Sequence, residues 1–227
     1  MVAETPGREV ETHPAKRPER VVLRGRYVTL EPLSASAHAD ALWACVGGEE
    51  RAELWKYMPD GPFVTREALD VVLRAKESSE DPHFFALIDP TSGVAAGHAS
   101  LMRIDPKNRV IEVGGIMYSA ALQRTRAATE AMYLLARYAF DELGYRRYEW
   151  KCNSFNEPSR RAALRLGFQF EGIFRQHMII KGRNRDTAWF SLLDSEWPAR
   201  KQGFERWLLP ENFDENGVQK TPLSFHQ

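Results

Sequence analysis

Several segments of the chain have the alternating or continuously apolar pattern that is typical of β-strands. The first is VVLRGRYVTLEPL (21–33), whose apolar members are Val22, Tyr27, Val28 and Leu30. Two apolar runs on either side of the turn sequence PTSG then predict a hairpin, and a third run follows it directly. The predicted strands after the first are 83–89, 94–104, 109–119, 146–152, 169–180 and 186–194.

A second set of segments places apolar residues three and four positions apart, as on one face of a helix. The clearest runs from Ala128 to Leu143 and ends at Gly144, a residue type that favours helix C-termini. Two other helices have N-cap signals, because Thr65 precedes an apolar face and Asn156 precedes the segment EPSRRAALRLGF. The remaining predicted helices are 35–46, 49–58 and a docked helix that ends near residue 209.

In chain order these elements are a strand, helices, a three-strand meander, a loop, a helix, a strand, a helix and two strands. This order predicts a mixed α/β (α+β) fold, in which helices flank a mostly antiparallel sheet. The passage through residues 110–152 predicts one right-handed crossover between parallel strands. Gly114 and Gly115 lie in the middle of a predicted strand, which indicates a β-bulge or the close approach of another backbone or a ligand.

Composition limits the classes of function. The chain has 227 residues, of which 43% are hydrophobic and 27% charged, as in ordinary globular proteins. Because 31 basic and 31 acidic side chains cancel, the net charge predicts binding neither to nucleic acid nor to an anionic membrane. Cys45 and Cys152 lack CxxC spacing and predict neither a disulfide framework nor a metal site. With no apolar run long enough for a membrane span and no secretory signal, we expect a cytoplasmic protein.

The sequence QRTRAAT (123–129) connects a predicted strand to a predicted helix and contains two arginines. Free backbone N–H groups converge at a helix N-terminus and attract anions. Phosphate-binding loops are usually rich in glycine, and this segment has none. By itself the segment is therefore consistent with a phosphate-binding loop or with a solvated basic turn.

Three motifs in order resemble the GNAT superfamily of N-acetyltransferases, and most closely its RimJ/RimL-like branch. IEVGGIMYS (111–119) is similar to the family's Glu-Ile-Gly-Tyr strand, and QRTRAATEA (123–131) to its acetyl-CoA loop. NSFNEPSRRAALRLGF (153–168) matches the family's Asn-x-x-Ser, helix and Leu-Gly-Phe. The resemblance covers residues 21–197 and implies an acetyl-CoA-dependent acyltransferase whose sheet is splayed in the middle.

The resemblance also divides the chain. Residues 1–20 carry three prolines, many charges and few bulky apolar groups, and we expect them to form a disordered N-terminal arm. Residues 21–197 would form the acetyltransferase domain. Residues 198–227 would be a partly helical C-terminal extension docked on it, since Phe204 and Trp207 are too apolar for a loose tail.

In this family, the backbone of Ile116, Met117 and Tyr118 would pair with the pantetheine arm of acetyl-CoA like an added strand. Asn156 and Ser159 would lie close to that arm. Arg126 stands where the family usually has glycine, and it can supply charge and a two-pronged donor to phosphate instead. The residues that would hold the diphosphate are Gln123, Arg124, Thr125, Arg126, Ala127, Ala128 and Thr129.

Acetyl transfer to an amine requires a base, a polarised thioester and a stabilised thiolate. Glu112 matches the family glutamate that takes the amine's proton, although a solvent-facing glutamate is an equal alternative. His98 on the adjacent strand is the other candidate base, or a structural histidine. Ser159 matches the family serine proposed to serve the thiolate, or satisfies an N–H of its own helix. Tyr118 is an alternative acid. Neither cysteine lies near an activating residue, so transfer would be direct, without an acyl-enzyme.

The sequence indicates the acceptor site less clearly than the cofactor site. Trp55, Tyr57 and Phe63 would line an acceptor site or belong to the core. The basic hairpin 175–187 favours an acidic acceptor or is a solvated turn. The sequence leaves open a protein N-terminus or a small-molecule amine, and a monomer or homodimer. A degenerate CoA-binding module and a ribosome-associated interaction protein are the alternative functions.

Overall fold

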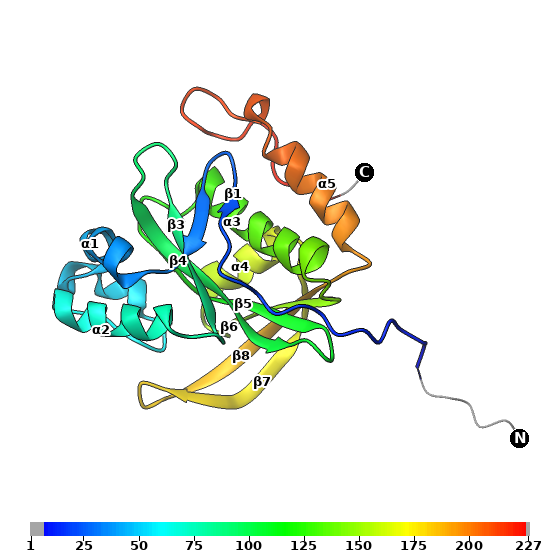
Figure 1. The fold of residues 1–227 in the computed structure, drawn as a ribbon, viewed down its shortest axis with the longest axis horizontal. Helices are drawn as coiled ribbons and strands as arrows, with labels where there is room; N and C mark the ends of the chain where they lie inside the picture. Colours follow the sequence, from blue (N-terminus) through cyan, green and yellow to red (C-terminus); the bar gives the residue numbers. More distant parts are fainter. Residues whose placement is uncertain (1–6, 226–227) are drawn as a thin grey trace, which may run out of the picture.

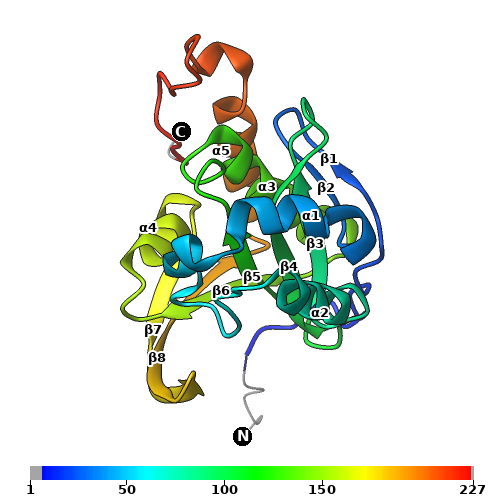
Figure 2. The same ribbon diagram turned by 90° about the vertical axis from the view of Figure 1, so that its left-hand side faces the viewer.

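The computed structural model describes residues 7–225 as one eight-stranded sheet with helices on both faces (Figures 1 and 2). The order across the sheet is β1-β2-β3-β4-β5-β6-β8-β7. The strands are β1 (Leu23–Arg24), β2 (Thr29–Pro32), β3 (His83–Ile88), β4 (Ala95–Asp105), β5 (Val110–Tyr118), β6 (Arg147–Asn153), β7 (Gln169–Ile180) and β8 (Arg183–Leu193). The α-helices are α1 (Ala35–Val46), α2 (Arg66–Glu77), α3 (Arg126–Arg137), α4 (Glu157–Arg165) and α5 (Trp197–Trp207). Shorter helical segments are η1 (Glu49–Trp55), the π-helical turn η2 (Tyr138–Glu142) and η3 (Pro210–Asn212).

The predicted α/β fold is confirmed. Strands β3, β4 and β5 form an antiparallel meander. Strands β5 and β6 are parallel neighbours, and the segment that connects them contains α3. The prediction of a single strand over residues 21–33 was wrong. The chain instead turns at Gly25, and β1 pairs antiparallel with β2.

A buried glutamate on α3 holds the turn between β1 and β2. The carboxylate of Glu130 accepts hydrogen bonds from the backbone N–H groups of Arg26, Tyr27 and Val28 at 2.9, 2.6 and 3.0 Å. A Cβ added at Gly25 would collide with this carboxylate. The turn therefore depends on a long-range interaction, which explains why periodicity did not reveal it.

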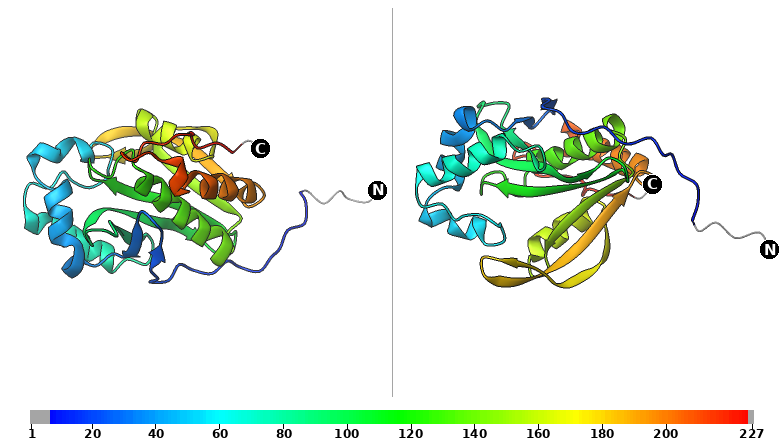
Figure 3. Two further views of the ribbon diagram at one scale, coloured as in Figure 1. Left: turned by 90° about the horizontal axis from the view of Figure 1, so that it is seen from above. Right: turned by 60° about the horizontal axis from the view of Figure 1, so that its bottom comes forward.

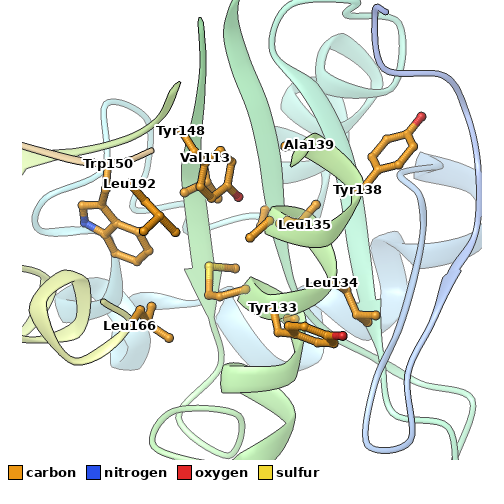
Figure 4. Close-up of a cluster of buried hydrophobic side chains, with 14 of the residues drawn as sticks. Val113, Tyr133, Leu134, Leu135, Tyr138, Ala139, Tyr148, Trp150, Leu166 and Leu192 are labelled. Atoms are coloured by element: carbon orange, nitrogen blue, oxygen red, sulfur yellow. The ribbon is translucent and has the colours of Figure 1, made fainter. Parts of the chain in front are cut away.

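Two hydrophobic clusters fill the two faces of the sheet. One cluster lies under α3, α4 and α5, where Leu135 and Ala139 approach Val113 and Tyr148 of the sheet (Figure 4). The other lies under α1 and α2 and includes Trp55. Thr65 caps α2 by accepting a hydrogen bond from the N–H of Ala68, as its position in the sequence predicted.

The sheet divides in its middle. Strand β5 pairs with β6 only from Val110 to Val113, whereas β6 stays paired with β8 as far as Asn153. Beyond Val113 the half containing β3–β5 and the half containing β6–β8 diverge like the arms of a V (Figure 3, right).

The ends of the chain pack against the domain more closely than composition indicated. Residues 7–20 form neither helix nor strand, but the N–H groups of Ala15 and Lys16 donate to the carbonyls of Pro106 and Leu143. The second half of the segment expected to be a disordered arm is therefore attached to the domain; residues 1–6 lie outside the described part. At the other end, α5 packs on α3 through aromatic side chains that include Trp197.

Candidate active site

Gly115 forms a β-bulge at the point where β5 leaves β6. His98 of β4 pairs with Met117, and Ser100 pairs with Gly114, so β5 has one more residue than β4 in this interval. Gly115 has a φ of 57°, in the left-handed region that favours glycine. The bulge exchanges the two faces of the strand, because Met117 packs in the cluster under α1 and α2. The bulge anticipated from the paired glycines is confirmed.

The splayed segment of β5 has one free edge. The last residue of β5 with a partner on β6 is Val113, so Ile116, Met117 and Tyr118 have a neighbouring strand only on the β4 side within residues 7–225. Backbone groups of an edge strand remain available to an added extended chain. The segment expected to hold pantetheine thus has the required free edge.

The first turn of α3 faces the same region with unsatisfied donors. Thr125 is the N-cap, and its Oγ1 accepts the N–H of Ala128 at 3.1 Å. The N–H groups of Arg126 and Ala127 have no protein acceptor among the described residues, as is usual at a helix start. Arg124 precedes them with a φ of 62° and an exposed side chain.

The two arginines of this loop differ in their surroundings. The Arg126 guanidinium lies 4.3 Å from the ring centre of Tyr27 and 5.3 Å from that of Phe213. The sequence did not indicate this stacking, which gives Arg126 a packing role between β1–β2 and the C-terminal extension. Gln123 is exposed, and its Nε2 donates to the carbonyl of Tyr118 at 3.3 Å.

Glu112 lies at the start of the divergence, buried to 5% exposure. Its Oε2 is 2.9 Å from Lys151 Nζ and 3.0 Å from Arg103 Nε. Its Oε1 is directed toward Gly114, where it would lie 3.3 Å from an added Cβ. Burial raises the pKa of Glu112, and the charges of Lys151 and Arg103 oppose that rise. The solvent-facing alternative for Glu112 is therefore excluded.

The ion pairs of Glu112 belong to a row of alternating charges that the sequence analysis missed. Lys151 also contacts Glu149 at 2.6 Å and lies 3.9 Å from the ring centre of Trp189. Glu149 in turn contacts Arg147 at 2.7 Å. The only sequence signal was the polar alternation in RRYEWKC, which does not reveal the partners on β4, β5 and β8.

His98 is enclosed by protein. Its Nδ1 is 2.9 Å from the carbonyl oxygen of Gly115, its Nε2 is 3.4 Å from Lys76 Nζ, and 1% of its surface is exposed. Burial and then the charge of Lys76 hold its pKa well below the usual value, so the ring is neutral. Because both nitrogens have protein partners, the geometry favours the structural alternative over a catalytic base.

Ser159 and Asn156 lie at the N-terminus of α4. Asn156 accepts the N–H of Ser159 at 3.2 Å, which confirms the predicted N-cap. The Ser159 hydroxyl accepts a hydrogen bond from Trp150 Nε1 at 3.0 Å, rather than an N–H of its own helix as the alternative held. Its side chain also lies within hydrogen-bonding reach of the Cys152 sulfur. Burial raises the pKa of the nearby Cys152 thiol.

Tyr118 is poorly suited to act as an acid. Its hydroxyl donates to the carbonyl of Ala128 at 3.3 Å, and burial raises its pKa. The phenol is therefore neutral, and its proton is used in the hydrogen bond to α3.

Two of the three aromatic residues expected at the acceptor site belong to the core. Trp55 has 0% of its surface exposed, and its Nε1 donates to the carbonyl of Val46. Phe63 is buried against Trp55, with ring centres 4.9 Å apart. The acceptor roles expected for Trp55 and Phe63 are therefore wrong, because tertiary packing encloses both rings. Tyr57 is half-buried and donates to the carbonyl of Phe155, in the loop between β6 and α4.

The tip of the β7–β8 hairpin also reaches this region. Lys181 Nζ donates to the carbonyl of Trp55 at 3.0 Å. The hairpin is not wholly a solvated turn, because Arg185 Nε is buried without a hydrogen-bond partner among the described residues. Burial lowers the pKa of Arg185.

Comparison with known families identifies the class of protein to which this chain belongs. The family described as "Acetyltransferase (GNAT) domain" matches residues 28–169, which is more than half of the chain. The chain belongs to the GNAT acetyltransferase family. It is thus an acetyl-CoA-dependent N-acetyltransferase, as the three motifs implied.

Individual relatives agree with this assignment. A GCN5-related N-acetyltransferase from Brucella melitensis is 55% identical, with a TM-score of 0.91 over 93% of this chain and 96% of that one. A protein from Chromobacterium violaceum ATCC 12472 described as a "probable acetyltransferases (GNAT family)" is 38% identical, with a TM-score of 0.79 over 87% of this chain and 98% of that one. The Bacillus subtilis (strain 168) protein named "Putative ribosomal N-acetyltransferase YdaF" is 33% identical over 109 residues. That match covers 48% of this chain and 59% of YdaF. The name of this relative agrees with the assignment of the chain to the RimJ/RimL-like branch.

None of the helices in the described part of the chain combines the length and the apolar character needed to cross a bilayer.

Proposed function

We propose that this protein transfers the acetyl group of acetyl-CoA directly to a primary amine that enters from the face of the sheet bearing Glu112. The observation that carries the proposal is the free edge of residues 116–118, which begins beside the buried carboxylate of Glu112. Thioester and base would thus meet where the two halves of the sheet diverge.

In this proposal the cofactor crosses the sheet through the gap. Pantetheine pairs with the backbone of Ile116, Met117 and Tyr118, and the diphosphate rests on the N–H groups of Arg126 and Ala127. Thr125 caps this turn by accepting the N–H of Ala128, and the hydroxyl of Thr129 donates to the Thr125 carbonyl. Gln123 precedes the turn and donates to the carbonyl of Tyr118. A backbone N–H of the splayed segment polarises the thioester carbonyl.

Glu112 is the proposed general base. The incoming amine is largely an ammonium ion at neutral pH, with a pKa of about 10, and must lose a proton before attack. The ion pairs with Lys151 and Arg103 keep Glu112 ionised although it is buried, and Oε1 is left to accept the proton, directly or through water.

The proposed scheme predicts opposite results for two neighbouring substitutions. Cys152→Ala should retain turnover, because the buried thiol takes no part in direct transfer. Ser159→Ala should lower kcat about tenfold without changing the affinity for acetyl-CoA, because the departing thiolate loses a donor. Steady-state kinetics with calorimetric binding would check both. Abolished turnover in Cys152→Ala would overturn direct transfer, and unchanged kcat in Ser159→Ala would restrict Ser159 to packing.

Substitutions of the two loop arginines can also be compared with each other. Arg124→Ala should raise the Kd for acetyl-CoA roughly three- to tenfold, and less at high salt, because its exposed charge faces the diphosphate in solvent. Arg126→Ala should change Kd less and instead lower the free energy of unfolding by about 1 kcal/mol, through the lost stacking on Tyr27 and Phe213. Calorimetry at two salt concentrations and urea denaturation distinguish the roles. Equal Kd values for wild type and Arg124→Ala would remove Arg124 from the site.

The acceptor is best sought with a thiol-release assay. Because YdaF is named for ribosomal N-acetylation, peptides with the N-termini of ribosomal proteins are the first acceptors to test on this chain. Polyamines, aminoglycosides and small amino compounds form the second group. Release of CoA that requires one of these amines supports the proposal. Binding of acetyl-CoA without release on any amine would indicate a degenerate CoA-binding module, and absence of binding an interaction protein.

A further inference from the structure

Three charged or polar side chains from separate elements converge behind the bulge of β5. Asp60, in the loop after η1, lies with its Oδ2 2.8 Å from Lys76 Nζ of α2. Lys76 Nζ is also 3.4 Å from His98 Nε2, and His98 Nδ1 is 2.9 Å from the carbonyl oxygen of Gly115. The side chain of Lys76 is 12% exposed and that of Asp60 23% exposed.

The partners of His98 determine where its proton lies. The ammonium of Lys76 can only donate a hydrogen bond, so Nε2 must be the unprotonated nitrogen. The carbonyl of Gly115 can only accept, so Nδ1 must carry the proton. Both contacts require the same neutral tautomer, and Asp60 keeps Lys76 in place by pairing with its charge.

The hydrogen bond from His98 satisfies the carbonyl of Gly115, a residue that has no partner on β4 in the ladder. The carbonyl of Gly114 is satisfied in the same way by the hydroxyl of Ser100, at 2.9 Å. The carbonyl of Gly115 is thereby held on the β4 side. In a trans peptide the N–H lies opposite the C=O, so the N–H of Ile116 is directed away from His98. At this position β5 is no longer paired with β6.

We propose that Asp60, Lys76 and His98 form a positioning chain, which fixes the peptide bond between Gly115 and Ile116 so that the Ile116 N–H polarises the thioester carbonyl of acetyl-CoA. None of the three touches the substrate. The inference rests on the proposed placement of the thioester at the free edge of β5. It assigns to His98 a function that neither a catalytic base nor a plain core residue would have.

The tautomer is tested first, in the free protein. Long-range ¹H–¹⁵N spectra of protein labelled with ¹⁵N-histidine report the protonation of each ring nitrogen, and the signals of His98 are those lost in His98→Asn. Protonated Nδ1 with unprotonated Nε2 is expected at neutral pH. The opposite tautomer, or a cationic ring, would refute the proposed positioning chain, whatever reaction the protein catalyses.

Polarisation of the thioester is tested next, without any acceptor. Infrared difference spectra of bound acetyl-CoA, labelled with ¹³C at the carbonyl, should show the C=O stretch at lower frequency than in free acetyl-CoA. His98→Leu removes the donor and should lose most of this shift. His98→Asn places an amide N–H near the position of Nδ1 and should keep most of it. An unchanged shift in His98→Leu would contradict the proposal.

Asp60 and Lys76 can be replaced while His98 is kept, which tests the positioning chain without changing the histidine. The double substitution Asp60→Asn, Lys76→Met removes both charges together and so leaves no unpaired ion behind. It should reduce the infrared shift and lower kcat about tenfold, as misplacement of a reacting group does, with an unchanged Kd for acetyl-CoA. A changed Kd with an unchanged infrared shift would show that these residues only support the fold. Failure of wild type to bind acetyl-CoA would instead refute the proposed function.

Discussion

Glu112→Gln is expected to lower kcat by about 10²- to 10⁴-fold, the usual contribution of a general base. The amide has nearly the same shape as the carboxylate but cannot take a proton from the amine. Lys151 keeps its ion pair with Glu149, and the amide oxygen of the introduced glutamine can still accept a hydrogen bond from Arg103. The Kd for acetyl-CoA should therefore change little, because the carboxylate acts on the acceptor.

The pH dependence gives the same test a second readout. Burial raises the pKa of Glu112 above its ordinary value of 4.5. The base works only when ionised, so kcat/KM should fall as the pH decreases through this raised pKa, and Glu112→Gln should lack that limb. Rates measured across acidic pH, with an acceptor whose own pKa is known, would show it.

Glu149→Gln is the matched control. Glu149 is also buried and also pairs with Lys151, but it lies on β6 as the ladder partner of Glu112, and Arg147 is its second ion-pair partner. Its substitution should affect stability more than kcat. If Glu149→Gln lowers kcat as much as Glu112→Gln does, the row of charges acts as a unit and Glu112 is not the base. If Glu112→Gln keeps full turnover, the assignment of the base is wrong.

Glu130→Ala is expected to lower the free energy of unfolding by about 3–5 kcal/mol. The carboxylate accepts three backbone N–H groups at the turn between β1 and β2, and its residue is 5% exposed. Hydrogen bonds to a charged group contribute about 1.5–3 kcal/mol each, and a buried donor left unsatisfied costs about 1–3 kcal/mol. The loss is large compared with a total stability of about 5–15 kcal/mol.

Urea denaturation checks this prediction, with Glu142→Ala as the control. Glu142 is an exposed carboxylate in η2, which continues α3, and its removal should change stability by no more than about 0.5 kcal/mol. Glu130→Gln should fall between the two, because an amide oxygen accepts without a charge. Equal stabilities of Glu130→Ala and Glu142→Ala would show that the turn holds without Glu130.

The sequence predicted features whose cause is local. Thr65 and Asn156 mark helix starts because each accepts an N–H only three residues ahead. The glycines at 114 and 115 marked the bulge because Gly115 needs a positive φ. The loop proposed to hold the diphosphate was recognisable because it lies within one strand–helix connection.

Features that depend on distant partners were missed or wrong. The turn at Gly25 is held by Glu130, more than a hundred residues away, and no periodicity in residues 21–33 reveals it. The pairing of Glu112 with Arg103 and Lys151 joins three strands. Trp55 was placed at the acceptor site because an aromatic residue in a short helical segment has the same pattern whether it is enclosed or open.

The most direct test of the central claim is a crystal structure with CoA bound. The account predicts that pantetheine lies along the free edge of residues 116–118 and that the diphosphate accepts the N–H groups of Arg126 and Ala127. A cofactor bound on another surface, or a diphosphate that leaves the start of α3 unoccupied, would contradict it.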